Sequence, residues 1–151
     1  MRQLVWNWVP LLLWMLVIFT ASTDLMSAEH TSRFIRPFLL WLAPNISAAA
    51  IATVQFLVRK AAHLTEFAIL AALLFRALWF GANQRAFLKV AGKALLLAAL
   101  YAALDEFHQS FVAARTASPG DVMIDTCGAA LGLALCWLFA RQKTPARALH
   151  K

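Results

Sequence analysis

Four long apolar stretches divide the chain, and polar or basic segments separate them. They cover about residues 4–21, 57–80, 90–111 and 120–140. A membrane-spanning helix needs roughly 20 mostly apolar residues, so each stretch predicts one span. The pattern therefore predicts an all-α, polytopic membrane protein, a four-transmembrane-helix bundle that forms one domain over residues 1–151.

The connection between the first two stretches holds a shorter apolar segment, RFIRPFLLWLAP. It is too short to span, so we expect an interfacial helix between spans 1 and 2. The first stretch could also be a cleaved signal peptide, because Arg2 precedes its apolar core. Its length and the lack of a small-x-small cleavage site favour a span.

The composition agrees with lipid as the main solvent of the protein. Of its residues, 62% are hydrophobic and 14% are charged, unlike the balance of a soluble domain. The net charge of +7 does not indicate nucleic acid as a partner, because the basic residues flank the apolar stretches. The lipid bilayer is the partner that this pattern predicts.

The charges are unequal on the two sides of the predicted bundle. The side that holds both termini and the loop between the second and third spans has nine basic residues, and the other side has all seven acidic ones. Because positive loops stay in the cytoplasm, we predict cytoplasmic termini and a basic cytoplasmic tail at 141–151. The nine residues are Arg2, Arg76, Arg85, Lys89, Lys93, Arg141, Lys143, Arg147 and Lys151.

Ionisable side chains interrupt the outer end of the second predicted span. Arg59 and Lys60 stand at the expected water boundary, and His63 and Glu66 follow roughly 5 and 9 Å deeper into the helix. Spacings of three and four residues place Arg59, His63 and Glu66 on one stripe.

The third and fourth predicted spans carry polar residues at a similar depth. Asp105, His108 and Gln109 share a face of the third span, with Glu106 offset by about 100°. On the fourth, Asp121 and Asp125 lie one turn apart and Gly128 and Gly132 follow. The two glycines permit close helix approach, which would bring Asp125 against a partner.

Intramembrane ionisable residues usually face the bundle interior and pair with one another. Three helices that offer such residues at one depth therefore predict a shared cavity open to the outside. We expect Arg115, in the connection VAARTASPGD, to cap it.

The segments RKAAHLTEF, DEFHQSFVAARTASPGDVMIDTCGAALG and FTASTD resemble the VanZ-like family of small bacterial integral membrane proteins. Two positions depart from the family pattern: Phe67 stands where Tyr is common, and the usual serine pair is reduced to AST. The family's motif residues fall on Lys60, His63, Glu66, Asp105, Glu106, Gln109, Arg115, Asp121, Asp125 and Gly128.

The resemblance implies a multi-pass protein of the bacterial cytoplasmic (inner) membrane that acts at the cell envelope. The family's namesake is associated with low-level resistance to teicoplanin, a lipid-bearing glycopeptide antibiotic. The resemblance therefore implies either a role in such resistance or the handling of a lipid-linked envelope substrate.

One hypothesis for the polar residues is acid/base catalysis on an amphiphilic or lipid-linked molecule at the outer leaflet. Neighbouring carboxylates can divide acid and base roles between them, and His63 could carry protons, with Asp105 as the first candidate base. The expected catalytic residues are His63, Glu66, Asp105, Glu106, Gln109 and Asp125. The expected substrate-binding residues are Arg59, Lys60, His108, Arg115 and Asp121.

Other interpretations stay open at this stage. The polar residues could form a structural network, or they could bind or pass an amphiphile or an ion, in a single chain or in a homo-oligomer. The His and carboxylate side chains could also hold a divalent metal. No metal or other cofactor is required by the pattern, because HLTEF and DEFHQ are weak motifs and the spacing is not HExxH.

Overall fold

The computed structural model describes residues 2–23, 28–79, 86–112 and 118–142. Within these stretches lie five α-helices and no β-strand, so the expected all-α fold is confirmed. The helices are α1 (Arg2–Ala21), α2 (Ala28–Leu42), α3 (Ala48–Trp79), α4 (Phe87–Gln109) and α5 (Pro119–Gln142).

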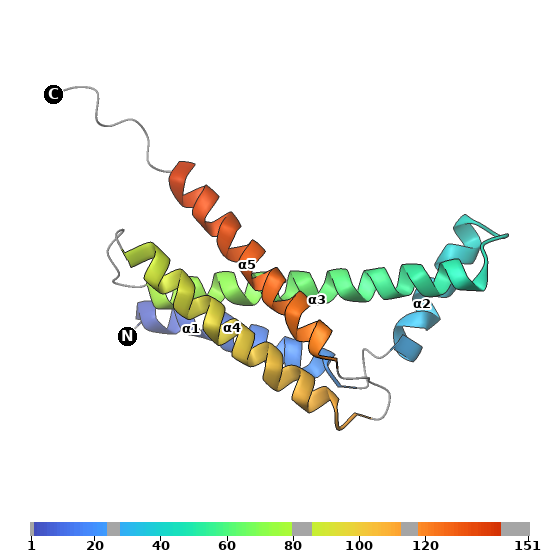
Figure 1. Cartoon of the computed structure of the whole chain (residues 1–151), viewed down its shortest axis with the longest axis horizontal. Coiled ribbons are helices and arrows are strands. Elements are labelled where there is room, and N and C mark those ends of the chain that lie inside the picture. Colours follow the sequence, from blue (N-terminus) through green and yellow to red (C-terminus); the bar gives the residue numbers. More distant parts are fainter. Residues whose placement is uncertain (1, 24–27, 80–85, 113–117, 143–151) are drawn as a thin grey trace.

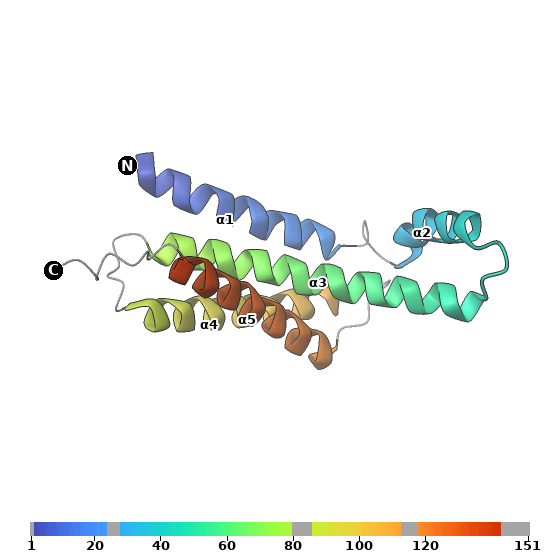
Figure 2. The same cartoon turned by 90° about the horizontal axis from the view of Figure 1, so that it is seen from above.

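The longest helix, α3, is the centre of the arrangement (Figures 1 and 2). α1, α2, α4 and α5 all contact it. α1 and α4 run antiparallel to α3, whereas α5 runs in the same direction as α3 (Figure 1). The start of α1 and the end of α5 therefore lie at the same end of the bundle.

Three helices are long and apolar enough to cross a membrane: α3, α4 and the Pro119–Ala140 part of α5. This agrees with a membrane protein. The apolar stretch found in α1, Val5–Ala21, is shorter than the other three. The fourth span and the interfacial helix therefore remain proposals.

α3 begins well before residue 57, where we expected the second span to start. The backbone N–H of Ala50 donates to Ser47 Oγ over 3.2 Å, so Ser47 caps a helix that then continues without a break to Trp79. A helix of 32 residues is about 48 Å long, more than the roughly 30 Å of a bilayer's hydrocarbon core. The part before Arg59 therefore extends beyond one membrane thickness.

That extension of α3 pairs with α2. Gln55 Nε2 donates to Ser32 Oγ over 2.9 Å. The resulting helical hairpin reaches past the ends of α1, α4 and α5 (Figure 2). Consequently, the connection that we expected between the first two spans is mostly helical.

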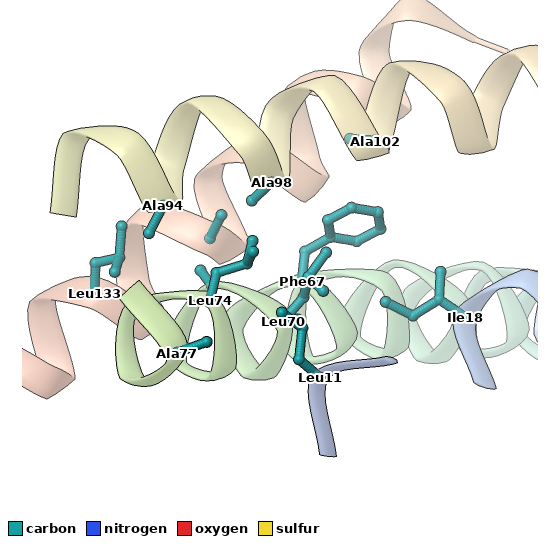
Figure 3. Close-up of a cluster of buried hydrophobic side chains, with 12 residues drawn as sticks. Leu11, Ile18, Phe67, Leu70, Leu74, Ala77, Ala94, Ala98, Ala102 and Leu133 are labelled. Atoms are coloured by element: carbon teal, nitrogen blue, oxygen red, sulfur yellow. The ribbon is translucent and has the colours of Figure 1, made fainter. Parts of the chain in front are cut away.

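The apolar core lies between α3 and its neighbours toward the end that holds both Arg76 and the start of α1. Three alanines of α4, spaced four residues apart, form a smooth face against α3 (Figure 3). Leu11 and Ile18 of α1 cover the other side of α3. The core also contains Phe67, Leu70, Ala71, Leu74, Ala77, Ala94, Ala98, Ala102, Ala129 and Leu133.

Two glycines allow α5 to touch α3 backbone to backbone. A Cβ atom added at Gly128 would lie 2.3 Å from the carbonyl oxygen of Leu64, and one at Gly132 would lie 2.2 Å from that of Ala68. Real Cβ atoms do not approach this closely, so no other residue fits at either position. The close approach predicted from the glycine spacing is confirmed.

Long-range hydrogen bonds attach α1 along its length. Arg76 Nη2 donates to the Trp6 carbonyl (2.7 Å) at one end of the helix. Trp14 Nε1 donates to the Glu66 carbonyl (3.0 Å), and Tyr101 Oη donates to the Met15 carbonyl (2.8 Å). These bonds set the rotation of α1, so its next polar residue, Ser22, faces α4.

Candidate functional site

The end of α4, the start of α5 and the middle of α3 enclose a cleft of about 460 Å³. It brings together five of the polar residues singled out in the sequence, which come from three separate helices. The lining residues are Phe56, Arg59, Lys60, His63, Gln109, Ser118, Gly120, Asp121 and Ile124.

A histidine that lines this cleft meets an aspartate buried behind it. His63 Nδ1 lies 3.3 Å from Asp125 Oδ1, which makes an ion pair when the imidazole is protonated. Asp125 is completely buried and His63 is 8% exposed. Neither carboxylate oxygen of Asp125 has a hydrogen-bond partner among the described residues. Asp125 therefore depends on the contact with His63 in a buried setting.

The close contact of α5 with α3 explains how Asp125 comes to this position. Asp125 lies one turn before Gly128, whose Cα rests against the backbone of Leu64 on α3. A bulkier residue at Gly128 would separate the helices and withdraw the carboxylate from His63.

Asp105 is held in a different way, by two donors. Ser22 Oγ donates to its Oδ1 (2.5 Å), and Gln109 Nε2 donates to its Oδ2 (2.8 Å). All three side chains are buried. We expected Asp105 to be the base beside His63, but the carboxylate that contacts His63 belongs to Asp125. Ligand atoms of His63, Asp105 and Asp125 nevertheless all lie within 4.8 Å of one another.

The wall of the cleft carries positive charge. Lys60 forms an ion pair with Asp121, and the two side chains are 20% and 17% exposed. The Lys60 ammonium also lies 5.3 Å from the centroid of the Phe56 ring, within the range of a cation–π contact. Arg59 lines the same cleft. These groups stand above the His63–Asp125 pair, on the side open to solvent.

Glu106 faces the start of α5. Its Oε2 accepts a hydrogen bond of 2.8 Å from the backbone N–H of Ser118, just before α5 begins. A carboxylate is favoured there by the helix dipole. Its Oε1 is buried without a hydrogen-bond partner in the described part of the chain. Glu106 therefore positions the start of α5, and with it Asp121.

Two other predicted site residues, His108 and Glu66, lie apart from the His63–Asp125 pair. The ring of His108 stacks on Phe19 of α1, with centroids 4.5 Å apart, and His108 is not among the cleft-lining residues. Glu66 is half-buried, one turn deeper than His63 on α3. Arg115 lies outside the described residues.

An apolar groove of about 380 Å³ lies between α1 and α4, beside the polar site. Tyr101 and Leu104 form its end nearest the site, and Asp105 and Gln109 are the next polar residues along α4. The groove is therefore close to the polar residues at its outer end. The full lining is Trp8, Leu11, Leu12, Met15, Leu70, Leu74, Leu97, Leu100, Tyr101 and Leu104.

Ser22 is a site residue that the sequence analysis did not select. It is 4% exposed and donates to Asp105. The signal for it was its place in FTASTD, directly after the first apolar stretch, where a hydroxyl would meet the outer ends of the other spans.

A comparison with protein-family profiles matches VanZ/LLP1 over residues 7–140. The chain belongs to the VanZ/LLP1 family. No curated protein and no solved structure matches the chain. The matched residues run from α1 to α5, so they include every helix that contributes to the cleft.

The VanZ/LLP1 match fits the resemblance noted from the sequence motifs. Phe67, one of the departures from the motif, is fully buried in the apolar core with its ring 6.3 Å from that of Tyr101. Phe67 does not line the cleft. The absence of a tyrosine hydroxyl at this position therefore does not change the wall of the cleft.

Proposed function

We propose that this VanZ/LLP1 protein binds an amphiphilic or lipid-linked molecule at the outer leaflet of the bacterial inner membrane and acts on it by acid/base chemistry. The observation that carries this proposal is the buried His63–Asp125 pair, whose histidine lines an open cleft. Buried polar groups that serve packing alone are normally hydrogen-bonded. His63 is the member of the pair that a molecule in the cleft would meet, with the Asp125 carboxylate directly behind it.

The chemistry follows from the neighbours of that pair. An imidazole and a carboxylate in contact can hold and pass a proton, and His is the commonest general acid or base. Asp105 already accepts two hydrogen bonds, so its role is to keep negative charge beside His63. Asp125 replaces Asp105 as the partner that we assign to His63.

The cationic wall suggests the chemistry of the substrate's polar end. Arg59 and Lys60 suit a phosphate or carboxylate, and a guanidinium can bind either group in a bidentate manner. Lys60 is already paired with Asp121, so an anionic head group would compete with that aspartate. An anionic head group is the part of the substrate that we place in the cleft.

The apolar groove is the site that we assign to the apolar end of the substrate. The groove between α1 and α4 is lined almost entirely by apolar side chains, and its outer end approaches Asp105. An alkyl chain in the groove would extend toward the head-group site from within the membrane. A lipid-bearing glycopeptide such as teicoplanin, or a lipid-linked envelope precursor, has this combination of parts.

This proposal includes four spans with both termini in the cytoplasm. The outward-facing side chains of α1 are apolar and exposed, including Leu12, Leu13 and Leu16, as expected for a helix in lipid. The exposed aromatic residues of α2, Phe34, Phe38 and Trp41, suit an interfacial position. Cysteine labelling from outside should modify Ser32→Cys in α2 and leave Lys89→Cys in α4 unmodified.

The decisive experiment uses Asp125→Asn, which keeps the size of the side chain and removes its charge. Expressed in a susceptible bacterium, the wild type should raise tolerance to teicoplanin, and Asp125→Asn and His63→Gln should abolish that gain. Lys93→Gln, at the opposite end of the bundle, should behave as wild type. A teicoplanin derivative without its acyl chain tests whether the groove matters, because tolerance to it should not change.

A structural network is the second candidate, favoured by the satisfied Ser22–Asp105–Gln109 hydrogen bonds between α1 and α4. It predicts that Asp125→Asn loses stability in detergent in proportion to any loss of tolerance. A stable Asp125→Asn protein without tolerance contradicts it.

A further inference from the structure

Three potential metal ligands from three helices gather behind the cleft, which His63 lines. His63 of α3, Asp105 of α4 and Asp125 of α5 each offer one ligand atom, and these atoms all lie within 4.8 Å of one another. The three residues are at most 8% exposed. A constellation this compact is built by the packing of the bundle and is not a patch of surface acids.

Asp125 supplies an independent sign that something is bound there. It is fully buried, and neither of its oxygens has a hydrogen-bond partner in the described part of the protein. The group that contacts it is His63, whose Nδ1 lies 3.3 Å from Asp125 Oδ1. Leaving a carboxylate so unsatisfied in a low-dielectric interior is costly, and a bound cation would remove the cost for Asp125 and Asp105 together.

The spacing of the pair is compatible with metal ligation. Ligand atoms about 2.1 Å from a tetrahedral zinc ion lie roughly 3.4 Å apart. His63 Nδ1 and Asp125 Oδ1 are 3.3 Å apart. The two atoms therefore have the separation that two ligands of one ion would have.

Asp105 is oriented as a metal-ligating carboxylate would be. Ser22 and Gln109 donate one hydrogen bond to each of its oxygens. Such outer partners fix the orientation of a ligand while leaving it lone pairs for the metal. Ser22 directly follows α1, so the end of this helix would be joined to the site through the Ser22 hydroxyl.

We propose that His63, Asp105 and Asp125 together bind one divalent transition-metal ion, zinc or manganese, directly behind the cleft. Imidazole suits these ions, and Mg²⁺ and Ca²⁺ prefer a shell of oxygen ligands. Three protein ligands would leave a coordination position open, and one of the three, His63, also lines the cleft. The inference rests on the site of the proposed function, to which the ion would add a means of polarising a substrate oxygen.

The test measures metal binding to the full chain in detergent, without any substrate. Protein depleted with a chelator is dialysed against ZnCl₂, MnCl₂ or MgCl₂, and the bound metal is determined by mass spectrometry. We expect one equivalent of zinc or of manganese, whichever binds more tightly, and no magnesium. Less than a tenth of an equivalent of both zinc and manganese overturns the proposal.

Substitutions test which side chains bind the metal ion. Asp125→Asn and His63→Gln should weaken binding of the preferred metal at least 100-fold, and Ser22→Ala about tenfold through the orientation of Asp105. Asp121→Asn is the matched control, because its carboxylate lies one turn away on α5 and pairs with Lys60. Equal weakening by Asp121→Asn and Asp125→Asn overturns the assignment.

A spectroscopic measurement on the wild type covers the case in which a variant does not fold. Co²⁺ in place of the native ion should give the intense visible absorption of a low-symmetry site with nitrogen and oxygen ligands, and zinc should displace it. Failure of metal binding with teicoplanin tolerance intact overturns this inference alone. Bound metal without tolerance contradicts the proposed function instead.

Discussion

The two ends of this bundle bury different kinds of side chain: apolar residues at one end, and polar and charged residues at the other. Toward the cytoplasmic end of the proposed topology, Ala94 and Ala98 of α4 meet Leu70 and Leu74 of α3, and the core there is wholly apolar. Toward the other end, six polar or charged residues are buried among the same helices. They are Ser22, His63, Asp105, Glu106, Gln109 and Asp125.

The apolar end is the part of the bundle that holds the helices together. In a membrane the association of helices depends on close packing, because lipid is as apolar as leucine. The apolar end provides such packing, and the glycines of α5 extend it to the level of Leu64. The polar end has few hydrogen bonds between helices and also buries polar atoms that have none among the described residues, so it contributes less. We therefore expect stability to depend on the first end and function on the second.

The largest effect on stability should come from Gly128→Ala at the boundary between the two ends. The new Cβ would lie 2.3 Å from a backbone oxygen of α3, so the helices must separate, at a cost of about 3 kcal/mol. Unfolding by a denaturing detergent measures the change. Gly92→Ala is the control, since nothing lies within 4 Å of its added Cβ. Equal behaviour of the two variants would show that α5 does not depend on contact with α3.

A smaller loss should follow Leu70→Ala in the apolar end. Leu70 is completely buried, so its removal leaves a cavity, although lipid lowers the transfer part of the cost; we expect about 2 kcal/mol. The same measurement applied to Leu131→Ala, whose leucine is 52% exposed, should give a much smaller change. A larger loss at Leu131 than at Leu70 would mean that the apolar end is not the stabilising core.

Ser22→Ala should have a modest effect at the polar end. It removes one buried hydrogen bond to Asp105, worth about 1 kcal/mol or less between membrane helices. Ser110→Ala serves as its control, because the Ser110 hydroxyl donates to the Phe107 carbonyl of its own helix. If Ser22→Ala unfolds the protein, α1 is held mainly through the polar end, and the contrast between the ends fails.

Asp125→Asn should change stability least of all in metal-depleted protein. The carboxylate has no hydrogen bond to lose among the described residues, and its burial as a charge is costly. Unfolding of the chelator-treated protein should be unchanged or slightly harder. A loss of about 3 kcal/mol, typical of breaking a buried ion pair, would instead show that His63 and Asp125 hold α3 and α5 together.

Some features of the site could be predicted because they depend on helical geometry alone. His63, Asp105 and Asp125 were selected because residues of three spans at one depth must share the same interior. The partnership of His63 with Asp125 was harder to foresee, because it depends on the rotation of α5 about its axis. That rotation is set by Gly128 and Gly132 against Leu64 and Ala68.

The apolar runs of the sequence determined that the chain is helical and that three of its helices can cross a membrane, because a bilayer requires long, internally hydrogen-bonded apolar segments. The sequence also determined the polar end, through charges that lipid does not tolerate. Only the tertiary structure decided that α3 continues outward to pair with α2, that Ser22 reaches Asp105, and that Asp125 lies unsatisfied beside His63. These depend on contacts between helices, which no periodicity along one helix contains.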